Sequence, residues 1–369
     1  MYSYFMRTAL YDLHKELGAV FTNFMGYEMP LYYKSIQEEH LNVRHSVGIF
    51  DVSHMGKIFI RGKDVEEFLS RITVENAEKI KEGMGQYTLL LDENGNIIDD
   101  EVFLNLGREY LIIPNAGMHE KIAEWMEKNA EGDVEIEDVS NEYSILAIQG
   151  KLSDEVLKEI LNIDLNLKFF GCMDVSGNNF KMDFEGRCII SRTGYTGERG
   201  YEMYVTPAEN AVGIFKKLLE KGGKYGIMPV GIGARDTLRL EKGFMLACNE
   251  FKGGRNPIEA GLEWCIDWEH NFIGKNALLE FKKREEYEKL TFLKCIEPGI
   301  PRQDDVVMKN GKNIGKVTSG NFSPCIKKGI ALAYINKKYI NFGENLIIKG
   351  RREIKAEIVK GPFVKKGEC

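Results

Sequence analysis

Hydrophobic residues recur at helical spacing in several stretches of this chain. Between residues 7 and 18, Leu10, Leu13 and Leu17 lie three or four positions apart, and Gly18 follows them. This spacing puts the leucines on one face of a helix, and a glycine commonly ends one. Similar patterns predict helices at residues 36–43, 63–80, 119–129, 152–163, 208–221 and 274–283, and one that follows a glycine turn within 228–243.

Other stretches are β-prone or alternate between apolar and polar positions, which predicts strands. We expect one strand at residues 48–60, strands at 110–113 and 201–205, two strands within 134–150, and a hairpin at 179–190 around Glu185-Gly186. From residue 290 to 364, short alternating segments with turns at Asn310-Gly311 and Phe342-Gly343 predict a small barrel or sandwich. This order of elements indicates an α+β fold with antiparallel sheets.

A second hairpin is predicted at residues 85–106, where two apolar runs flank a turn at Asn94-Gly95. Its second strand contains Asp99 and Asp100 among apolar residues, and neighbouring strand residues point to opposite faces. Alternation groups Asp100 with Ile98, Val102 and Leu104, so the pattern alone predicts that Asp100 is the buried aspartate. The alternative reading is an edge strand that its charges protect.

The stretch from Phe24 to Tyr33 is dense in aromatic residues and methionine, and it contains Gly26 and Pro30. Such a stretch is more often a loop packed in the core than a segment that binds a cofactor. We therefore expect a core loop there.

Glycines recur every three residues at 194, 197 and 200, just before the strand at 201–205. Without a side chain, glycine lets the backbone approach another group closely, so this segment is predicted to be a loop with such a contact. Alternation in the strand puts Glu202 and Tyr204 on one face.

Arg235 and Arg239 lie four residues apart on one face of a predicted helix. Like charges at this spacing repel, so an anion or a carboxylate beside them would explain the pair, although two solvated arginines remain an alternative. Before them, Gly231-x-Gly233 lacks the third glycine and the preceding apolar strand of a dinucleotide site.

Asp51, Ser53 and His54 suggest a hydrolase triad, but their spacing opposes it. Neighbours along a strand diverge to opposite faces, whereas triad residues converge from separate segments. We therefore reject a triad here.

Composition narrows the class of protein. The 369 residues suggest two or three domains, and a net charge of -6 argues weakly against nucleic-acid binding. No apolar run approaches the roughly 20 residues of a membrane span, and the start lacks the pattern of a signal peptide. Seven scattered cysteines without a Cys-x-x-Cys motif predict reduced, buried thiols in a cytoplasm. The spacing of His40 and His45 does not fit a two-histidine metal site, and we expect no metal.

Together, nine short motifs make the chain resemble the aminomethyltransferase (T-protein) family of the glycine cleavage system. They are Gly26-Tyr-Glu-Met-Pro30, Asp51-Val-Ser-His-Met55, Tyr87-Thr-Leu-Leu-Leu91, Ile98-Asp-Asp100, Gly194-Tyr-Thr-Gly-Glu198, Gly233-Ala-Arg-Asp-Thr-Leu-Arg-Leu-Glu241, Pro257-Ile-Glu-Ala-Gly261, Phe272-Ile-Gly-Lys275 and Thr318-Ser-Gly-Asn-Phe-Ser-Pro324. The resemblance implies an α+β cloverleaf of two folate-binding modules and a C-terminal β-barrel. We expect one module at 1–50 and 145–280, an inserted module at 51–144 that carries the hairpin, and the barrel at 285–369.

The resemblance also implies roles for individual residues. It assigns catalysis to Asp99, against the burial that alternation predicts. Pterin binding falls to Tyr195 and Glu202, and a substrate-site role to Arg235. Further channel positions match Met55, Tyr87 and Asn115. The chain departs from the family at Leu246-Ala-Cys248, where Leu-Tyr-Gly is usual, and in its tail, Phe363 to Cys369, where the family often has a defined basic residue.

By the same resemblance, the enzyme moves the methylene of an aminomethyl group from the lipoyl arm of H-protein to tetrahydrofolate, its co-substrate, and releases ammonia. H-protein is the expected partner, with P-protein and L-protein functionally linked, and we expect no nucleotide cofactor, nucleic acid or membrane. Two alternatives stay open. One is a folate-dependent demethylase of a small methyl donor. The other is a folate-binding regulator, whose signature contains a cysteine that Gly194-Tyr-Thr-Gly-Glu198 lacks.

Overall fold

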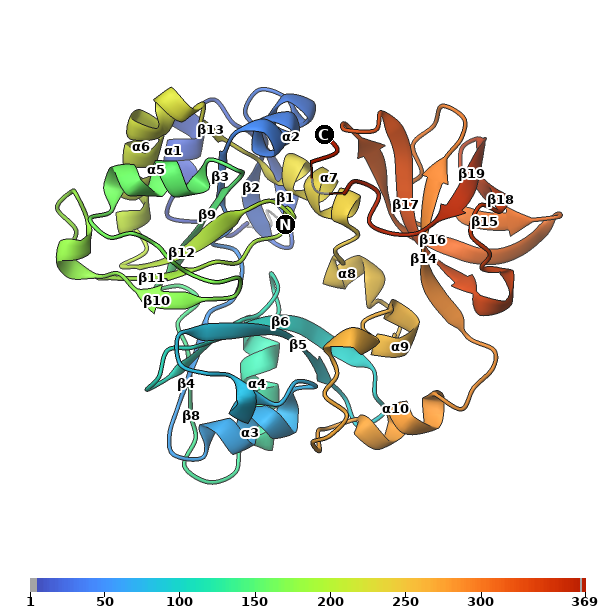
Figure 1. The fold of residues 1–369 in the computed structure, drawn as a ribbon, viewed down its shortest axis with the longest axis horizontal. Helices are drawn as coiled ribbons and strands as arrows, with labels where there is room; N and C mark the ends of the chain where they lie inside the picture. The colour runs from blue at the N-terminus through green and yellow to red at the C-terminus, as the bar shows by residue number, and fades with distance from the viewer. Residues whose placement is uncertain (1–4, 366) are drawn as a thin grey trace. The chain divides into compact units, whose positions relative to one another are not determined.

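The computed structural model of the chain describes residues 5–365 and 367–369 (Figure 1). The chain divides into two compact units. The first comprises Met1–Ile72, Asn76–Thr88 and Glu101–Arg235, and the second comprises Thr73–Glu75, Leu89–Asp100 and Asp236–Cys369.

A six-stranded sheet forms the centre of the first unit, in the order β10-β11-β12-β9-β3-β13. Neighbouring strands are antiparallel except β13 and β3, which are parallel. The strands are β3 (Gly48–Asp51), β9 (Ser144–Gln149), β10 (Cys172–Asp174), β11 (Arg187–Ser191), β12 (Gly200–Thr206) and β13 (Met228–Pro229). Pro229 lies on the edge strand, where its missing N–H costs no ladder hydrogen bond.

Helices α1 (Tyr11–Glu16), α5 (Ser153–Ile160) and α6 (Asn210–Gly222) cover one face of this sheet (Figure 1). Leu13, Leu157 and Leu218 from the helices pack with Ile148 and Met203 from the strands, and all five are buried. The apolar spacing that predicted helices at 7–18, 152–163 and 208–221 therefore marked the faces that meet the sheet.

Two stretches fold differently from the expectation. Residues 48–60 form two strands in different sheets, because a turn closed by Met55 N–H and Val52 O (3.1 Å) separates β3 from β4 (Ile58–Arg61). Residues 24–33 are not a core loop. They belong to a hairpin of β1 (Val20–Phe24) and β2 (Tyr27–Tyr32), whose turn has positive φ at Met25 and Gly26. Ser35 then caps α2 (Ile36–His45) by accepting a hydrogen bond from the backbone of Glu38.

The expected hairpin at 179–190 is also wrong. Strand β11 pairs with β10 and β12 instead, and Gly186 marks the place where the backbone of Thr206 passes. A Cβ on Gly186 would lie 2.1 Å from the carbonyl oxygen of Thr206, so the glycine provides close approach rather than a turn between strands.

A five-stranded sheet has the order β5-β6-β7-β4-β8, and the division between the units falls within β5 and β6. Its remaining strands and its two helices are β5 (Met84–Leu91), β6 (Ile97–Asn105), β7 (Tyr110–Ile113), β8 (Glu135–Asp138), α3 (Val65–Ile72) and α4 (His119–Asn129). The hairpin of β5 and β6 is confirmed, with Gly95 at φ 78° in a turn closed by Asp92 N–H and Asn96 O (2.9 Å).

The structure reverses the burial that alternation predicted in β6. Asp99 is fully buried (0% exposed), whereas Asp100 is half-buried. Ile97, Glu101 and Phe103 are buried on the face of Asp99. The prediction failed because this face is buried although two of its four residues are carboxylates, so counting apolar residues picked the wrong face.

The second unit contains the predicted barrel, a closed sheet in the order β14-β17-β16-β15-β18-β19. Its strands are β14 (Glu288–Cys295), β15 (Val306–Lys309), β16 (Lys312–Ser323), β17 (Lys328–Asn336), β18 (Asn345–Lys349) and β19 (Glu353–Val359). Ala331, Ala333 and Ile335 point into the barrel core, while Ile330 and Leu332 belong to a second cluster. Strand β17 is thus apolar on both faces, because its outer face packs on Leu240 of α7 (Ile232–Lys242).

Short helices precede the barrel: α8 (Ala247–Glu250), α9 (Pro257–Ala260) and α10 (Lys275–Phe281). Asn256 and Glu259 form a capping box around Pro257 at the start of α9. None of the helices in the described ranges is long and apolar enough to cross a membrane.

The expectation of reduced, buried thiols is wrong for three cysteines. Cys325 and Cys369 form a disulfide, and Cys248 is exposed. Cys172, Cys188, Cys265 and Cys295 are free and buried, as expected. Cys325 and Cys369 are 44 positions apart, and sequence spacing does not reveal such a pairing.

Candidate functional site

The glycine-rich loop at 194–200 is held by one buried side chain, Gln149 on β9. Its Nε2 donates to the carbonyl oxygens of Thr193 (3.1 Å) and Tyr201 (3.3 Å), and its Oε1 accepts from the hydroxyl of Thr196 (3.0 Å). A Cβ on Gly194 would lie 2.1 Å from Oε1 of Gln149, and one on Gly200 would lie 2.5 Å from the same amide group. The predicted close approach is confirmed, and the group approached is Gln149.

The loop is also held from outside by Arg44 on α2. The guanidinium of Arg44 donates to the carbonyl oxygen of Thr196 (2.6 Å) and to Oε1 of Glu198 (2.9 Å). The Arg44 side chain is 1% exposed, so the pair is shielded from water and fixes the loop tightly. Sequence reasoning missed both residues, because Gln149 only ends an apolar strand and Arg44 is one of several charged residues in α2, so neither has a distinctive pattern.

Glu202 lies on β12, directly opposite Ser191 of β11 in the register of the two strands. Its Oε2 accepts hydrogen bonds from the hydroxyl of Thr193 (2.5 Å) and from the phenol of Tyr204 (3.4 Å). Burial, and then the charge of Glu202, raises the pKa of Tyr204 well above its usual value, so this phenol keeps its proton. The predicted shared face of Glu202 and Tyr204 is confirmed by this contact.

Tyr195 and Arg235 lie together in the first unit. The guanidinium carbon of Arg235 is 4.6 Å from the centre of the Tyr195 ring, which is within the range of a cation–π contact. Burial lowers the pKa of Arg235, and the negative charge of Glu202 opposes this shift. Tyr195, Glu202 and Arg235, which are distant in sequence, therefore form one group with an aromatic ring, a carboxylate and a guanidinium.

The turn before Arg235 is packed against the backbone of β2. A Cβ on Gly231 would lie 2.3 Å from the carbonyl oxygen of Leu31, and one on Gly233 would lie 2.9 Å from it. The backbone N–H of Gly231 donates to Oε2 of Glu39 (2.9 Å), a fully buried carboxylate of α2. Close packing against Leu31 thus explains why both positions are glycine, and no dinucleotide motif is needed to explain them.

Met55 and Asn115 follow the ends of β3 and β7, and their loops meet. The backbone N–H of Gly56 donates to the carbonyl oxygen of Pro114 (2.8 Å), so the residues beside this bond, Met55 and Asn115, are brought close together. Both side chains are half-buried, as is Tyr87 on β5.

Asp51 forms a buried network that excludes the triad. Its Oδ2 accepts from Thr8 Oγ1 (2.6 Å) and contacts His14 Nε2 (2.9 Å), while Nδ1 of His14 contacts the hydroxyl of Tyr33 (2.8 Å). Burial alone would raise the pKa of Asp51, but hydrogen bonds with His14, Ser53 and Thr8 and the charge of His14 lower it to about 2. Asp51 is thus paired with His14, and the rejection of the triad is confirmed.

His54, considered above only as a triad candidate, and Lys57, which no sequence pattern singled out, are buried beside Met55. The His54 ring packs edge-on against Phe24, with ring centres 5.4 Å apart, and burial lowers its pKa to about 3. Lys57 Nζ donates to the carbonyl oxygen of Ser53 (2.9 Å), and burial lowers its pKa to about 7. The loop of Met55 therefore rests on a neutral histidine and a lysine that titrates near neutral pH.

In the second unit, Arg239 has the carboxylate neighbours that its spacing predicted. It donates to Asp236 Oδ1 (2.9 Å from Nε), to Glu250 Oε2 (3.3 Å) and to Ser319 Oγ of the barrel (2.9 Å). The Arg239 side chain is 2% exposed, so the alternative of a solvated arginine is wrong for this residue. Arg239 anchors α7 to the barrel and does not face an open site.

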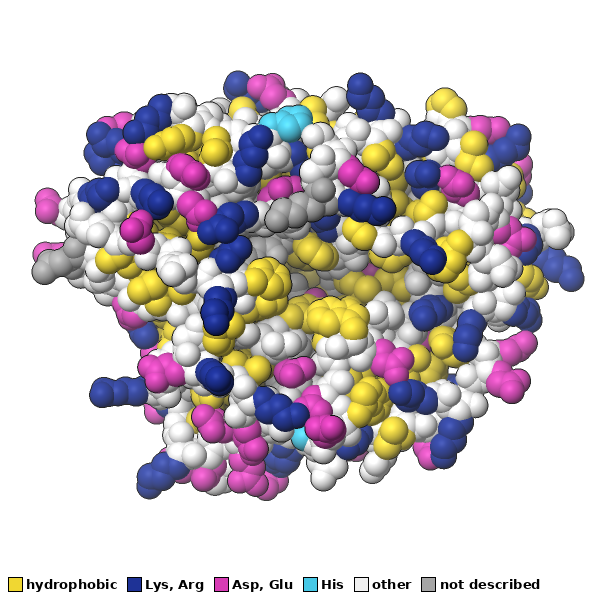
Figure 2. Space-filling model, viewed as in Figure 1, with side chains coloured by type: hydrophobic (Ala, Val, Ile, Leu, Met, Phe, Trp, Pro, Cys, Tyr) yellow, Lys and Arg dark blue, Asp and Glu magenta, His cyan; other side chains and the backbone are white. Residues whose placement is uncertain are grey.

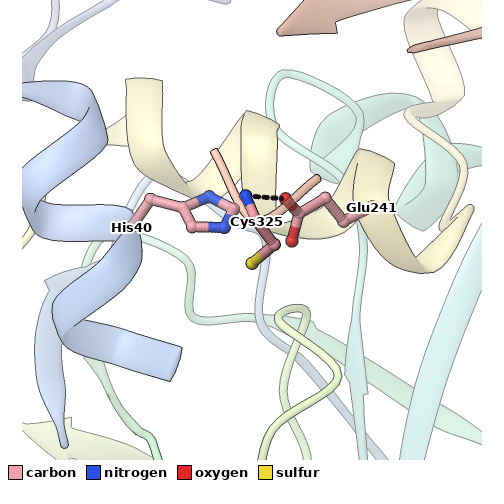
Figure 3. A group of neighbouring side chains, drawn as sticks. All are labelled: His40, Glu241 and Cys325. Atoms are coloured by element: carbon pink, nitrogen blue, oxygen red, sulfur yellow. Dashed lines mark hydrogen bonds between the residues drawn. The ribbon is translucent and has the colours of Figure 1, made fainter. Parts of the chain in front are cut away.

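Further along α7, Glu241 is tied to the loop between β16 and β17. Its Oε1 accepts from Ser323 Oγ (2.5 Å) and from the backbone N–H of Cys325 (3.2 Å; Figure 3). Figure 3 also draws His40, which belongs to the first unit. Because the sulfur of Cys325 is bonded to Cys369, it cannot serve as a thiolate ligand for a metal ion in this form of the protein.

Asp99 belongs to the second unit, whereas the other six candidate residues belong to the first. Within the first unit, the structure groups Tyr195 with Glu202 and Arg235, and the loop of Met55 with that of Asn115. On the face drawn in Figure 2, basic and acidic side chains are interspersed.

Comparisons with known proteins agree with this architecture. Residues 10–270 match the family model described as the GCVT N-terminal domain, and residues 289–365 match the glycine cleavage T-protein C-terminal barrel domain. The chain is 40% identical over 362 residues to the aminomethyltransferase of Halothermothrix orenii, covering 97% of this chain and 99% of that protein. It is 39% identical over 366 residues to the aminomethyltransferase of Bacillus subtilis, covering 98% and 99%.

Among solved structures, the glycine cleavage system aminomethyltransferase T of Bartonella henselae matches with a TM-score of 0.90 and 31% sequence identity, over 98% of this chain and 99% of that one. This match and the closed barrel confirm the predicted fold class. The chain belongs to the glycine cleavage T-protein family of aminomethyltransferases.

Proposed function

We propose that this chain is the aminomethyltransferase of a glycine cleavage system. It transfers the methylene carbon of the aminomethyl group on the lipoyl arm of H-protein to tetrahydrofolate. The products are ammonia, 5,10-methylenetetrahydrofolate and the dihydrolipoyl arm. Similarity to aminomethyltransferases over almost the whole chain supports this reaction.

The observation that carries the proposal is the group of Tyr195, Glu202 and Arg235. A pterin ring offers a flat aromatic face and an edge of N–H donors. An aromatic ring can stack on the face, and a carboxylate oxygen accepts from the edge. Oε1 of Glu202 has no hydrogen-bond partner among the described residues, so it is available for such an edge. Arg235 packs on Tyr195, and the charge of Glu202 opposes the lowering of the Arg235 pKa by burial.

We assign the chemistry to Asp99, a fully buried carboxylate on β6. An ionised carboxylate can accept a hydrogen bond from a folate amine and support positive charge that develops as ammonia leaves. We assign substrate or cofactor binding to Met55, Tyr87 and Asn115, which match family positions. We also propose that the chain has three domains, at residues 1–50 with 145–280, 51–144 and 285–369.

We further propose that the enzyme works in the cytoplasm with P-protein and L-protein, without a metal or a nucleotide cofactor. The test is an assay of ammonia release with aminomethylated H-protein, with and without tetrahydrofolate. Ammonia release that depends on both substrates is expected. Turnover of free methylated amines, with none of H-protein, would instead indicate a folate-dependent demethylase.

The matched pair Asp99→Asn and Asp100→Asn tests the catalytic assignment, because the two residues are neighbours on opposite faces of one strand. We expect Asp99→Asn to lose most turnover while tetrahydrofolate still binds, and Asp100→Asn to stay near the wild-type rate. The opposite result would assign catalysis to Asp100.

A further inference from the structure

A chain of buried hydroxyl groups leads to Glu202. Ser191 Oγ is 2.5 Å from Thr193 Oγ1, and Thr193 Oγ1 is 2.5 Å from Glu202 Oε2. The hydroxyl of Tyr204 lies 3.3 Å from Ser191 and 3.4 Å from Oε2 of Glu202. Ser191, Thr193 and Tyr204 are at most 5% exposed, so water does not compete for these bonds.

The direction of these bonds follows from counting protons. A hydroxyl has one proton to donate, and an ionised carboxylate can only accept. Thr193 therefore donates to Glu202, and Ser191 donates to Thr193. Tyr204 keeps its own proton and can donate to Ser191 or Glu202. The bonds therefore run towards Glu202, and Oε2 accepts the last of them, from Thr193.

The backbone fixes the first and last members of this chain relative to each other. Ser191 and Glu202 are register partners across β11 and β12. Thr193 lies just beyond β11, where Gln149 binds its carbonyl oxygen (3.1 Å). The backbone of Thr193 is thus held by strand β11, which precedes it, and by Gln149, and this fixes the place of its hydroxyl group.

We propose that Thr193 is a positioning residue for folate recognition. By holding Oε2 of Glu202, the Thr193 hydroxyl fixes the carboxylate plane and leaves Oε1 to accept from the donor edge of the pterin. This inference rests on the proposed role of Glu202 in binding folate. The site then selects ligands that carry N–H donors at that edge, because no hydroxyl proton of the chain is left to donate to a ligand acceptor.

The test compares Thr193→Val, which removes the hydroxyl at nearly constant volume, with Thr193→Ser, which keeps it. We expect Thr193→Val to raise the Kd of tetrahydrofolate about tenfold, close to the lower end of the scale for a hydrogen bond to a charged group. Thr193→Ser stays within twofold of wild type. The KM for tetrahydrofolate rises with Kd while kcat changes less than threefold, whereas a general loss of structure would lower kcat as well. Thr291→Val, which removes a buried hydroxyl of the barrel bonded to Lys289 O, is the control and leaves Kd unchanged.

A double-mutant cycle separates this inference from the proposed function. Glu202→Ala alone should weaken folate binding, and adding Thr193→Val to it should change Kd less than twofold, because the two residues act through one bond. Unchanged Kd in Thr193→Val with weakened binding in Glu202→Ala would overturn the inference and leave the proposed function standing. Unchanged Kd in Glu202→Ala would overturn both.

A second variant covers a folding failure of Thr193→Val. Ser191→Ala removes only the donor to Thr193, and we expect a Kd about threefold higher with an unchanged melting temperature. If Thr193→Val does not fold, the Kd of Ser191→Ala tests the inference in its place. A wild-type Kd in Ser191→Ala would then overturn the inference.

Discussion

At the scale of single residues, Asp51 shows how partners decide the state of a buried carboxylate. Its pKa of about 2 lies below the ordinary 3.8. The folded protein therefore holds this proton more weakly than the unfolded chain does. The resulting stability is fully present above pH 4 and is lost as the pH falls towards 2.

This linkage gives a prediction for acid unfolding. Between pH 5 and 2, the wild-type free energy of unfolding should fall by about 2 kcal/mol more than that of Asp51→Asn. Urea denaturation at a series of pH values measures the difference. Parallel curves for the two proteins would mean that Asp51 has no depressed pKa.

Glu202 and Arg235 test whether the grouped side chains bind folate. Glu202→Ala and Arg235→Ala should each weaken folate binding by roughly 1.5–3 kcal/mol, the usual scale for a hydrogen bond to a charged group. Equilibrium titration with tetrahydrofolate measures the loss, and circular dichroism should stay native. Unchanged affinity and unchanged KM in either variant would show that its charge has no part in folate binding.

At the scale of elements, glycines with opposite roles can be compared directly. Gly194 abuts Gln149, so Gly194→Ala should destabilise the protein by about 1–3 kcal/mol through overpacking and weaken folate binding. Gly213 lies within α6, and the nearest atom to a Cβ there is 3.9 Å away. Gly213→Ala should therefore stabilise by about 0.5–1 kcal/mol. Thermal melting of both variants checks the pair, and a stabilising Gly194→Ala would contradict the close packing.

The disulfide offers another test at this scale. It joins residues 44 positions apart, and closing a loop of that length stabilises by about 4 kcal/mol in the chain-entropy account. Cys369→Ser should lose stability in non-reducing buffer and should no longer respond to dithiothreitol. Cys248→Ser, which changes an exposed free cysteine, is the matched control. Equal stability of the oxidised and reduced wild type would contradict a structural role for the bond.

Helices and strands were predictable where only one of their faces is buried. They were less predictable where neighbouring elements decide which sheet a strand joins. Helical spacing found α1, α5 and α6, because their apolar stripes meet one sheet. The stretch 48–60 looked like one strand, since an apolar pattern cannot show that β3 and β4 enter different sheets. Of the site, the sequence pattern found the loop at 194–200 and the shared face of Glu202 and Tyr204. The resemblance supplied the proposed roles, and Gln149, Arg44 and Thr193 emerged only from the folded structure.

At the scale of the whole molecule, ligands distinguish a folate enzyme from a nucleotide enzyme. A ligand that binds only the folded state stabilises it by mass action, by about 2.7 kcal/mol at a hundredfold excess over its Kd. Tetrahydrofolate should therefore raise the melting temperature in a concentration-dependent manner. NAD should not, because Gly231 and Gly233 are packed against the backbone of Leu31 and do not begin a complete dinucleotide motif.

The two ligands should be compared in wild type and in Glu202→Ala. The variant should need a higher tetrahydrofolate concentration for the same rise in melting temperature, because its Kd for tetrahydrofolate is higher while its ligand-free fold is unchanged. Equal shifts in both proteins would place folate binding away from Glu202. A rise with NAD and none with tetrahydrofolate would contradict a folate enzyme altogether, since mass action requires that the ligand which stabilises the fold is the one that binds it.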